Sequence, residues 1–144
     1  MSTIVVGVDG SKGSIDALRL AVDEARMRSA DVKAVGAWHV PTYAYGSGWS
    51  VPVAPDSFRK TTQSALEKSL DEADTAGSGV TVTAVVGEGQ AADVLCHEAR
   101  DADLLVVGSR GLGGFTGLLL GSVSQQCAQH ASCPVLVVPG KSRD

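Results

Sequence analysis

Five short runs of apolar residues, spaced along the whole 144-residue chain, constrain its fold more than any other feature. Within each run Val, Ile, Leu and Ala follow one another almost without interruption, instead of alternating with polar residues. Continuous apolar runs of this length are typical of strands that are buried on both faces of a sheet. We therefore predict five buried strands, over residues 3–8, 32–40, 80–86, 104–107 and 134–138.

The segments between these runs have the periodicity of helices. Four helices are predicted: from a cap at Ser11 or Ser14 through Arg26, from Asp56 or Ser57 to a cap at Gly77, and over residues 91–100 and 122–131. Strands that alternate with helices indicate parallel strands joined by right-handed crossovers. The predicted fold is α/β, with a doubly wound five-stranded parallel sheet that carries helices on both faces. Its length predicts a single domain over residues 1–144.

The segment over residues 41–55 is the one irregular connection. It is rich in Pro, Gly and Ser and is too long for an ordinary connection in a compact domain. We expect a flexible loop here. It is either a flap over a site or a tolerated surface insertion, and the sequence leaves both open.

Charge and composition exclude several classes of partner. The net charge is -4 and the pI is about 5.3, with Lys and Arg scattered, so a nucleic-acid partner is not expected. No apolar run approaches the roughly 20 residues that span a bilayer, so no membrane partner is expected. The first residues lack a basic segment and a cleavage site, which favours a cytoplasmic protein.

The three cysteines point to free thiols rather than to a disulfide framework. Cys127, His130 and Cys133 have a spacing that could suit zinc. They supply three ligands at most, and Pro134 breaks the helix directly after them. Packing of the thiols as small apolar groups is the favoured interpretation.

A glycine-rich stretch from Gly108 to Ser122 follows the fourth predicted strand. In open α/β sheets ligands bind beyond the carboxyl ends of the strands, so this stretch is the leading candidate site. Gly108 would let the chain turn sharply, and Gly111 would leave room for a flat or charged group against the backbone. Gly121 and Ser122 begin the next helix, whose free N–H groups favour an anion such as phosphate. Glycines also serve plain turns, and from glycine content alone both readings stay open.

Familiar catalytic and phosphate motifs are absent at the required spacing. The stretch matches neither G-x-x-x-x-G-K-[ST] nor G-x-G-x-x-G, and no serine stands in G-x-S-x-G. The three histidines have no nucleophile near them in sequence. No catalytic residue is predicted.

The spacing of Gly108, Gly111, Gly121 and Ser122 resembles the ATP-binding signature of universal stress proteins, G-x2-G-x9-G-[S/T]. The likeness extends over nearly the whole chain: the opening IVVGVDGS, the His39-Val40 pair that closes the second predicted strand, the VVG after the third and the terminal CPVLVVP. The resemblance implies a Rossmann-like fold of the adenine nucleotide alpha hydrolase-like type.

The resemblance also implies a ligand site. Asp9 would lie beside the ribose and a Mg²⁺ ion, and the backbone of Val40 would hold adenine. The remaining nucleotide-binding positions that it implies are Gly7, Val8, Val107, Gly108, Arg110, Gly111, Gly121, Ser122, Val123 and Ser124. The family pairs its last strand across a twofold axis, which implies a homodimer through Pro134, Val135, Leu136, Val137 and Val138.

The expected function is that of an ATP-binding, nucleotide-dependent module in stress response or signalling, with at most slow hydrolysis. Two alternatives remain open. One is an enzyme that transfers a phosphoryl or adenylyl group from ATP, and the other is a structural dimer without nucleotide function.

Overall fold

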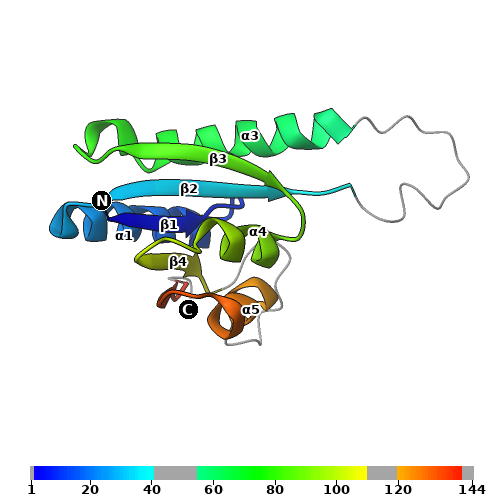
Figure 1. Ribbon diagram of the computed structural model, residues 1–144. Coiled ribbons are helices and arrows are strands. Elements are labelled where there is room, and N and C mark those ends of the chain that lie inside the picture. The colour runs from blue at the N-terminus through cyan, green and yellow to red at the C-terminus, as the bar shows by residue number, and fades with distance from the viewer. Residues whose placement is uncertain (1, 41–54, 110–119, 141–144) are drawn as a thin grey trace, which may run out of the picture.

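The computed structural model describes residues 2–40, 55–109 and 120–140. Its elements in chain order are β1 (Thr3–Gly7), α1 (Lys12–Arg28), β2 (Asp31–Trp38), α3 (Pro55–Glu72), the 3-10 helix η1 (Thr75–Gly77), β3 (Val82–Glu88), α4 (Ala91–Glu98), β4 (Leu104–Gly108), α5 (Ser122–His130) and β5 (Val135–Val138). The strands form a five-stranded parallel sheet, so the predicted fold class is confirmed (Figure 1).

The strand order is β3-β2-β1-β4-β5, which puts β1 in the middle of the sheet. From β1 the chain first builds outward through β2 and β3. It then returns to the other side of β1 with β4 and β5. The strand order therefore reverses between β1 and β4. All carboxyl ends point to the same edge, called the carboxyl edge below, because every pair is parallel.

Helices cover both faces of the sheet, and each face has its own core (Figure 1). Neighbouring residues of one strand point to opposite faces, so Val6 packs under α1 and α3 while Val5 packs under α4 and α5. Ile4, Val5 and Val6 are all fully buried. This double burial explains why the apolar runs are continuous rather than alternating.

Two strand glycines let α4 lie close to the sheet. A Cβ atom added at Gly7 would lie 2.8 Å from Cδ1 of Leu95, and one added at Gly87 would lie 2.7 Å from Cγ1 of Val94. Both helix residues are buried. Since real Cβ atoms do not approach so closely, glycine at these two positions sets the distance between helix and sheet.

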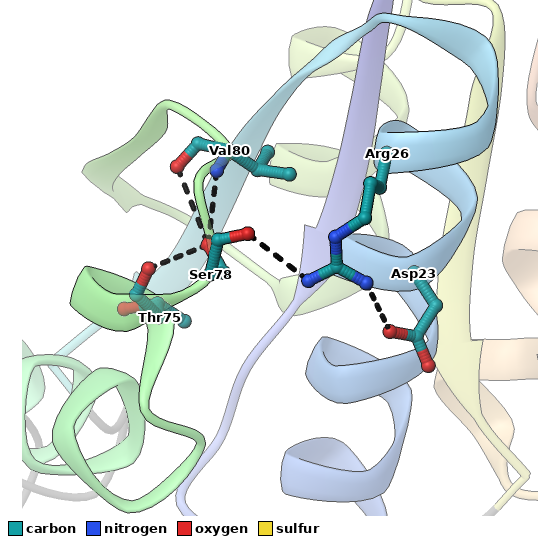
Figure 2. A network of polar contacts seen from close by, with 5 residues as sticks. All are labelled: Asp23, Arg26, Thr75, Ser78 and Val80. Atoms are coloured by element: carbon teal, nitrogen blue, oxygen red, sulfur yellow. Dashed lines mark hydrogen bonds and ion pairs between the residues drawn. The ribbon is translucent and has the colours of Figure 1, made fainter.

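Polar contacts tie α1 to the connection between α3 and β3 (Figure 2). The guanidinium of Arg26 donates to Oδ1 of Asp23 at 3.0 Å and to the carbonyl oxygen of Ser78 at 3.1 Å. The Ser78 hydroxyl donates to the carbonyl oxygen of Thr75 at 2.6 Å and accepts from the N–H of Val80 at 3.1 Å. The turn before β3 is thereby held by Arg26 of α1 on one side and by hydrogen bonds among its own residues on the other.

This turn corrects two predictions. The helix does not extend to a cap at Gly77, because α3 ends at Glu72 and Gly77 belongs to η1. The third strand starts at Val82 rather than at residue 80, since Ser78 and Val80 make the turn and Gly79 has a left-handed φ of 80°. Smaller shifts occur elsewhere: β2 ends at Trp38, α4 ends at Glu98 and β5 begins after Pro134.

The predicted flexible loop lies almost entirely outside the described residues. Its last residue, Pro55, is the first residue of α3. Within the described ranges, no helix combines the length and the apolar character needed to cross a bilayer.

Candidate functional site

The carboxyl ends of β1 and β4 lie side by side where the strand order reverses. Gly7 ends β1 and Gly108 ends β4. The backbone continues to pair beyond these ends: the N–H of Val8 donates to the carbonyl of Val35 at 2.9 Å, and the N–H of Ser109 donates to the carbonyl of Val138 at 2.8 Å. Four strands, β1 with β2 and β4 with β5, are therefore held in register up to the edge at which ligands bind in such sheets.

The carbonyl oxygen of Ser109 fixes the start of α5. It accepts from the N–H of Gly121 and, at 3.1 Å, from the hydroxyl of Ser124. The same hydroxyl lies 3.0 Å from the carbonyl oxygen of Gly121. Ser124 is 1% exposed, so these contacts are shielded from water. As a result the predicted residues Gly108, Gly121 and Ser122 meet at one place, although the sequence separates them.

The start of α5 offers hydrogen-bond donors to the carboxyl edge. Gly121 is its N-cap residue, with φ -76° and ψ 171°, and no side chain caps the helix. The first N–H groups of a helix have no acceptor within it, and they lie at the positive end of its dipole. The hydroxyl-bearing Ser122 is exposed, whereas Val123 is half-buried. A helix start of this kind suits an anionic group.

Asp9 follows β1 at the same edge and takes part in the start of α1. Its Oδ1 accepts from the N–H of Ser11 at 2.9 Å, and its own N–H lies 3.3 Å from Oγ of Ser14. Ser11 is the N-cap of α1, and its hydroxyl accepts from the N–H of Ser14 at 3.1 Å. Asp9 is exposed, so its carboxylate is held by the turn and still faces solvent.

A pocket of about 360 Å³ opens at the carboxyl edge, on the face that α4 and α5 cover. It is lined by Ala37, His39, Gly89, Gln90, Ala91, Ala92, Asp93, Ser122, Val123 and Gln126. Ser122 and Val123 were predicted as site residues, whereas Gly108 and Asp9 are not among the lining residues. The pocket therefore lies between the first turns of α4 and α5 and the end of β2.

Sequence reasoning missed His39, Gln90, Asp93 and Gln126 as pocket residues. A signal was present for three of them, because His39 follows β2, and Gln90 and Asp93 follow β3, at carboxyl ends where ligands bind. Gln126 lies in the second turn of α5 and gives no such signal.

The remaining predicted positions are placed as follows. Val8 and Val107 are buried at the ends of β1 and β4. Val40 is half-buried, two residues after the end of β2. Gly7 packs against Leu95 of α4. Arg110 and Gly111 lie outside the described residues.

The donor groups decide how a magnesium ion could be held. The described part of the chain contains no group of three or more His, Cys, Asp or Glu side chains that could hold a metal. Mg²⁺ prefers octahedral oxygen ligands and commonly takes most of them from phosphates and water. The exposed carboxylate of Asp9 fits one position of such a shell, and the phosphates of a nucleotide would have to supply others.

The strand order, the uncapped start of α5 and the pocket beside it define a Rossmann-like α/β fold with a pocket at the carboxyl edge. The chain belongs to the universal stress protein family, because the model of that family matches residues 1–139. Universal stress protein Rv2623 of Mycobacterium tuberculosis (strain ATCC 25618 / H37Rv) is 40% identical over 139 residues, which are 93% of this chain and 44% of that protein. The chain thus spans less than half the length of this relative.

Solved structures with the same fold include nucleotide complexes. A universal stress protein in complex with cAMP matches with a TM-score of 0.72 and 29% identity, over 95% of this chain and 96% of that chain. A family member from Arabidopsis thaliana with AMP bound matches with a TM-score of 0.65 and 23% identity, over 100% of this chain and 95% of that chain. At 23% identity the match to the Arabidopsis thaliana protein supports a shared fold alone.

Proposed function

We propose that this chain binds an adenine nucleotide at the carboxyl edge and works as a nucleotide-dependent module in stress response or signalling. The observation that carries the proposal is the junction at Ser109, which holds the uncapped start of α5 beside the end of β4. The 29%-identical universal stress protein in complex with cAMP supports the class of ligand.

ATP with Mg²⁺ is the proposed form of the nucleotide. Its phosphates would lie at Gly108, Gly121 and Ser122, where helix N–H groups and the Ser122 hydroxyl can donate. Asp9 would accept from ribose hydroxyls or share in holding the Mg²⁺ ion, which neutralises phosphate charge when bound. The backbone of Val40 would hold the adenine.

Binding rather than dedicated catalysis is proposed. Asp93 and His39 are the titratable side chains among the residues that line the pocket, and no hydrogen bond or ion pair within the described ranges joins them as an acid and a base. At most slow hydrolysis is therefore expected. A phosphoryl- or adenylyl-transferring enzyme would need a second group of polar residues to hold the acceptor.

The first experiment identifies the ligand. The purified protein is denatured, and any nucleotide released is separated by chromatography. The emptied protein is then titrated calorimetrically with ATP, ADP, AMP and cAMP, each with and without Mg²⁺. ATP that binds more tightly with Mg²⁺ than without it supports the proposal. Absence of heat with all four nucleotides would refute it and leave the structural-dimer alternative.

The second experiment tests the position of the phosphates. Gly121 has an extended backbone that any residue adopts, so Gly121→Val should fold normally and place its side chain where the phosphates are proposed. We expect loss of nucleotide binding. Ala76→Val is the control, because Ala76 is exposed in η1, ahead of the amino end of β3. A Gly121→Val variant that binds like the wild type would rule out this phosphate site.

A homodimer through the last strand is proposed as well. β5 lies at the edge of the sheet, and its residues Val135–Val138 are apolar yet only half-buried. An apolar strand with a free edge favours pairing with a second chain. The carbonyls of Pro134 and Val138 point toward β4, where they accept from Leu105 and Ser109. Because strand residues alternate, the backbone N–H and C=O of Val137 point away from β4.

This alternation allows a matched pair of variants. Val137→Pro removes an outward N–H group and leaves the bonds to β4 intact, whereas Val137→Ala loses similar packing and keeps that N–H. Molar mass in solution is measured by light scattering. We expect a dimer for the wild type and Val137→Ala, and a monomer for Val137→Pro. Equal masses for all three would exclude pairing through this edge.

A further inference from the structure

The three cysteines gather in the core between α4, α5 and the start of β5. Cys127 of α5 is fully buried within this core, and Cys96 of α4 and Cys133 are half-buried and pack against it. They come from three separate parts of the fold. The predicted packing of the thiols as apolar groups is thereby confirmed, and this packing gathers all three thiols in one core.

Cys96 of α4 and Cys127 of α5 belong to the same core between these two helices. Burial raises the pKa of the Cys127 thiol to about 12, and the next causes are the charge of Cys96 and a side-chain hydrogen bond with it. Cys133 has a weaker influence on Cys127. Burial also raises the pKa of Cys133, followed by the charges of Cys96 and Asp103. The thiols of Cys96 and Cys127 therefore lie in the same core, at the interface of α4 and α5.

A metal does not account for this arrangement. His130 is exposed, so it does not join Cys127 in the core, and the described side chains form no group of three ligands. Two thiols in one core have chemistry of their own, since oxidation can join them.

We propose that Cys96 and Cys127 are a peroxide-sensitive pair that forms a disulfide between α4 and α5. Cys96 is half-buried, so a small peroxide reaches its sulfur before that of the fully buried Cys127. The Cys96 sulfur takes one oxygen from hydrogen peroxide, which gives a sulfenic acid and one water. The Cys127 sulfur then attacks the Cys96 sulfur. The S–S bond forms, the S–O bond breaks, and the hydroxide leaves with the Cys127 proton as a second water. Two thiols have lost two electrons, and the peroxide has gained them.

The disulfide would join the two helices whose first turns line the pocket. An S–S bond is shorter than the contact between two thiols, so the bond draws α4 and α5 together. This consequence rests on the proposed function: if the pocket holds a nucleotide, oxidation changes its affinity.

The full chain is treated with hydrogen peroxide, digested with trypsin without reduction and studied by mass spectrometry. Trypsin places Cys96 in the peptide 69–100, and both Cys127 and Cys133 in the peptide 111–141. We expect these two peptides to be linked with the loss of two hydrogens, and dithiothreitol to separate them. The link should persist in Cys133→Ser and be lost in Cys127→Ala. An unlinked wild type, or a link that survives Cys127→Ala, would overturn the pair.

Two further readouts separate the remaining outcomes. A non-reducing gel of Cys133→Ser should show a monomer band after oxidation, and a covalent dimer would overturn the intramolecular bond. Calorimetry with ATP and Mg²⁺ on oxidised and reduced Cys133→Ser should give different Kd values. Equal values would refute the effect on the pocket. Absence of binding in both forms refutes the nucleotide proposal, while the peptide result decides the disulfide independently.

Discussion

The hydroxyl of Ser124 donates to the carbonyl oxygen of Ser109 in a buried hydrogen bond of 3.1 Å. It joins the first turn of α5 to the end of β4. The N–H of Gly121 donates to the same carbonyl, so two donors meet on one acceptor. The position of the helix start thus depends on a small side chain that reaches back to a strand, and this dependence can be tested.

Replacing Ser124 with alanine removes one of these two donors. The Ser109 carbonyl keeps the N–H of Gly121, so no buried acceptor is orphaned, and the free energy of unfolding should fall by about 1 kcal/mol. Nucleotide affinity should also fall, because the start of α5 is held less firmly. Urea unfolding and calorimetry provide the two measurements. Ser132→Ala is the matched control, since Ser132 is exposed and its hydroxyl lies 3.5 Å from the carbonyl of Arg100. If Ser124→Ala matched this control, the bond would have no role in the site.

Adding a methyl group at Gly87 should destabilise the protein more than adding one at Gly7. The new Cβ atoms would lie 2.7 Å from Val94 and 2.8 Å from Leu95. Leucine can change rotamer, whereas valine is stiff at χ1, so Gly87→Ala should cost about 1 to 3 kcal/mol and Gly7→Ala less.

A double variant tests the cause of this difference. Val94→Ala removes the clashing methyl groups, so Gly87→Ala should cost much less in a Val94→Ala background, as thermal or urea unfolding can show. Additive effects of the two substitutions would mean that the clash with Val94 is not the reason.

Alkaline pH should destabilise the wild type through Cys127. The thiol of the unfolded chain loses its proton near its ordinary pKa of 9.0, whereas burial and Cys96 raise the folded pKa to about 12. Between these values the folded state binds more protons, so stability falls as pH rises. The stability of the wild type relative to Cys127→Ala should be constant below pH 9 and then decline toward pH 12. The decline is at most about 1.4 kcal/mol per pH unit. Urea unfolding in a pH series measures it, and a constant difference throughout would contradict the raised pKa.

Replacing Arg26 with alanine should open the turn before β3 more than it lowers global stability. Its side chain is 54% exposed, so the global loss should be about 1 kcal/mol or less. The carbonyl of Ser78 loses its donor, and amide hydrogen exchange at Val80 should become faster. Arg28→Ala is the control, because Arg28 pairs with Glu24 inside α1. Equal exchange in both variants would mean that Arg26 does not hold the turn.

The sheet could be predicted from the sequence, because a strand that is buried on both faces has apolar residues at successive positions. Neighbouring residues such as Val5 and Val6 serve different cores, and a run with no polar interruption is the result. The meeting of Gly108 with Gly121 and Ser122 was likewise predictable, because strand ends and helix starts converge at the edge of a parallel sheet. Both inferences depend on periodicity, which the chain carries locally.

Other features depend on contacts between distant elements. Gln126 has the spacing of any polar residue on a solvated helix face, and only the approach of α4 makes it a wall of the pocket. Gly7 lies at a strand end, where the resemblance implies a ligand, yet the space beside it contains Leu95. Gly77 has the composition of a helix cap, but the hydrogen bonds of Thr75 and Ser78 end the helix earlier. A local sequence pattern does not show which residue of a distant element packs beside a given position.

The carbonyl oxygen of Ser109 accepts two hydrogen bonds from the start of α5, which makes the segment between β4 and α5 a candidate for exchange. The bonds from Gly121 and Ser124 hold the start of α5 against the end of β4 by contacts that lie outside the connecting segment. The entropic cost of closing a loop grows only slowly with its length. Segments of other lengths and compositions could therefore be grafted between residues 109 and 121 to change what the edge recognises, while the scaffold stays the same.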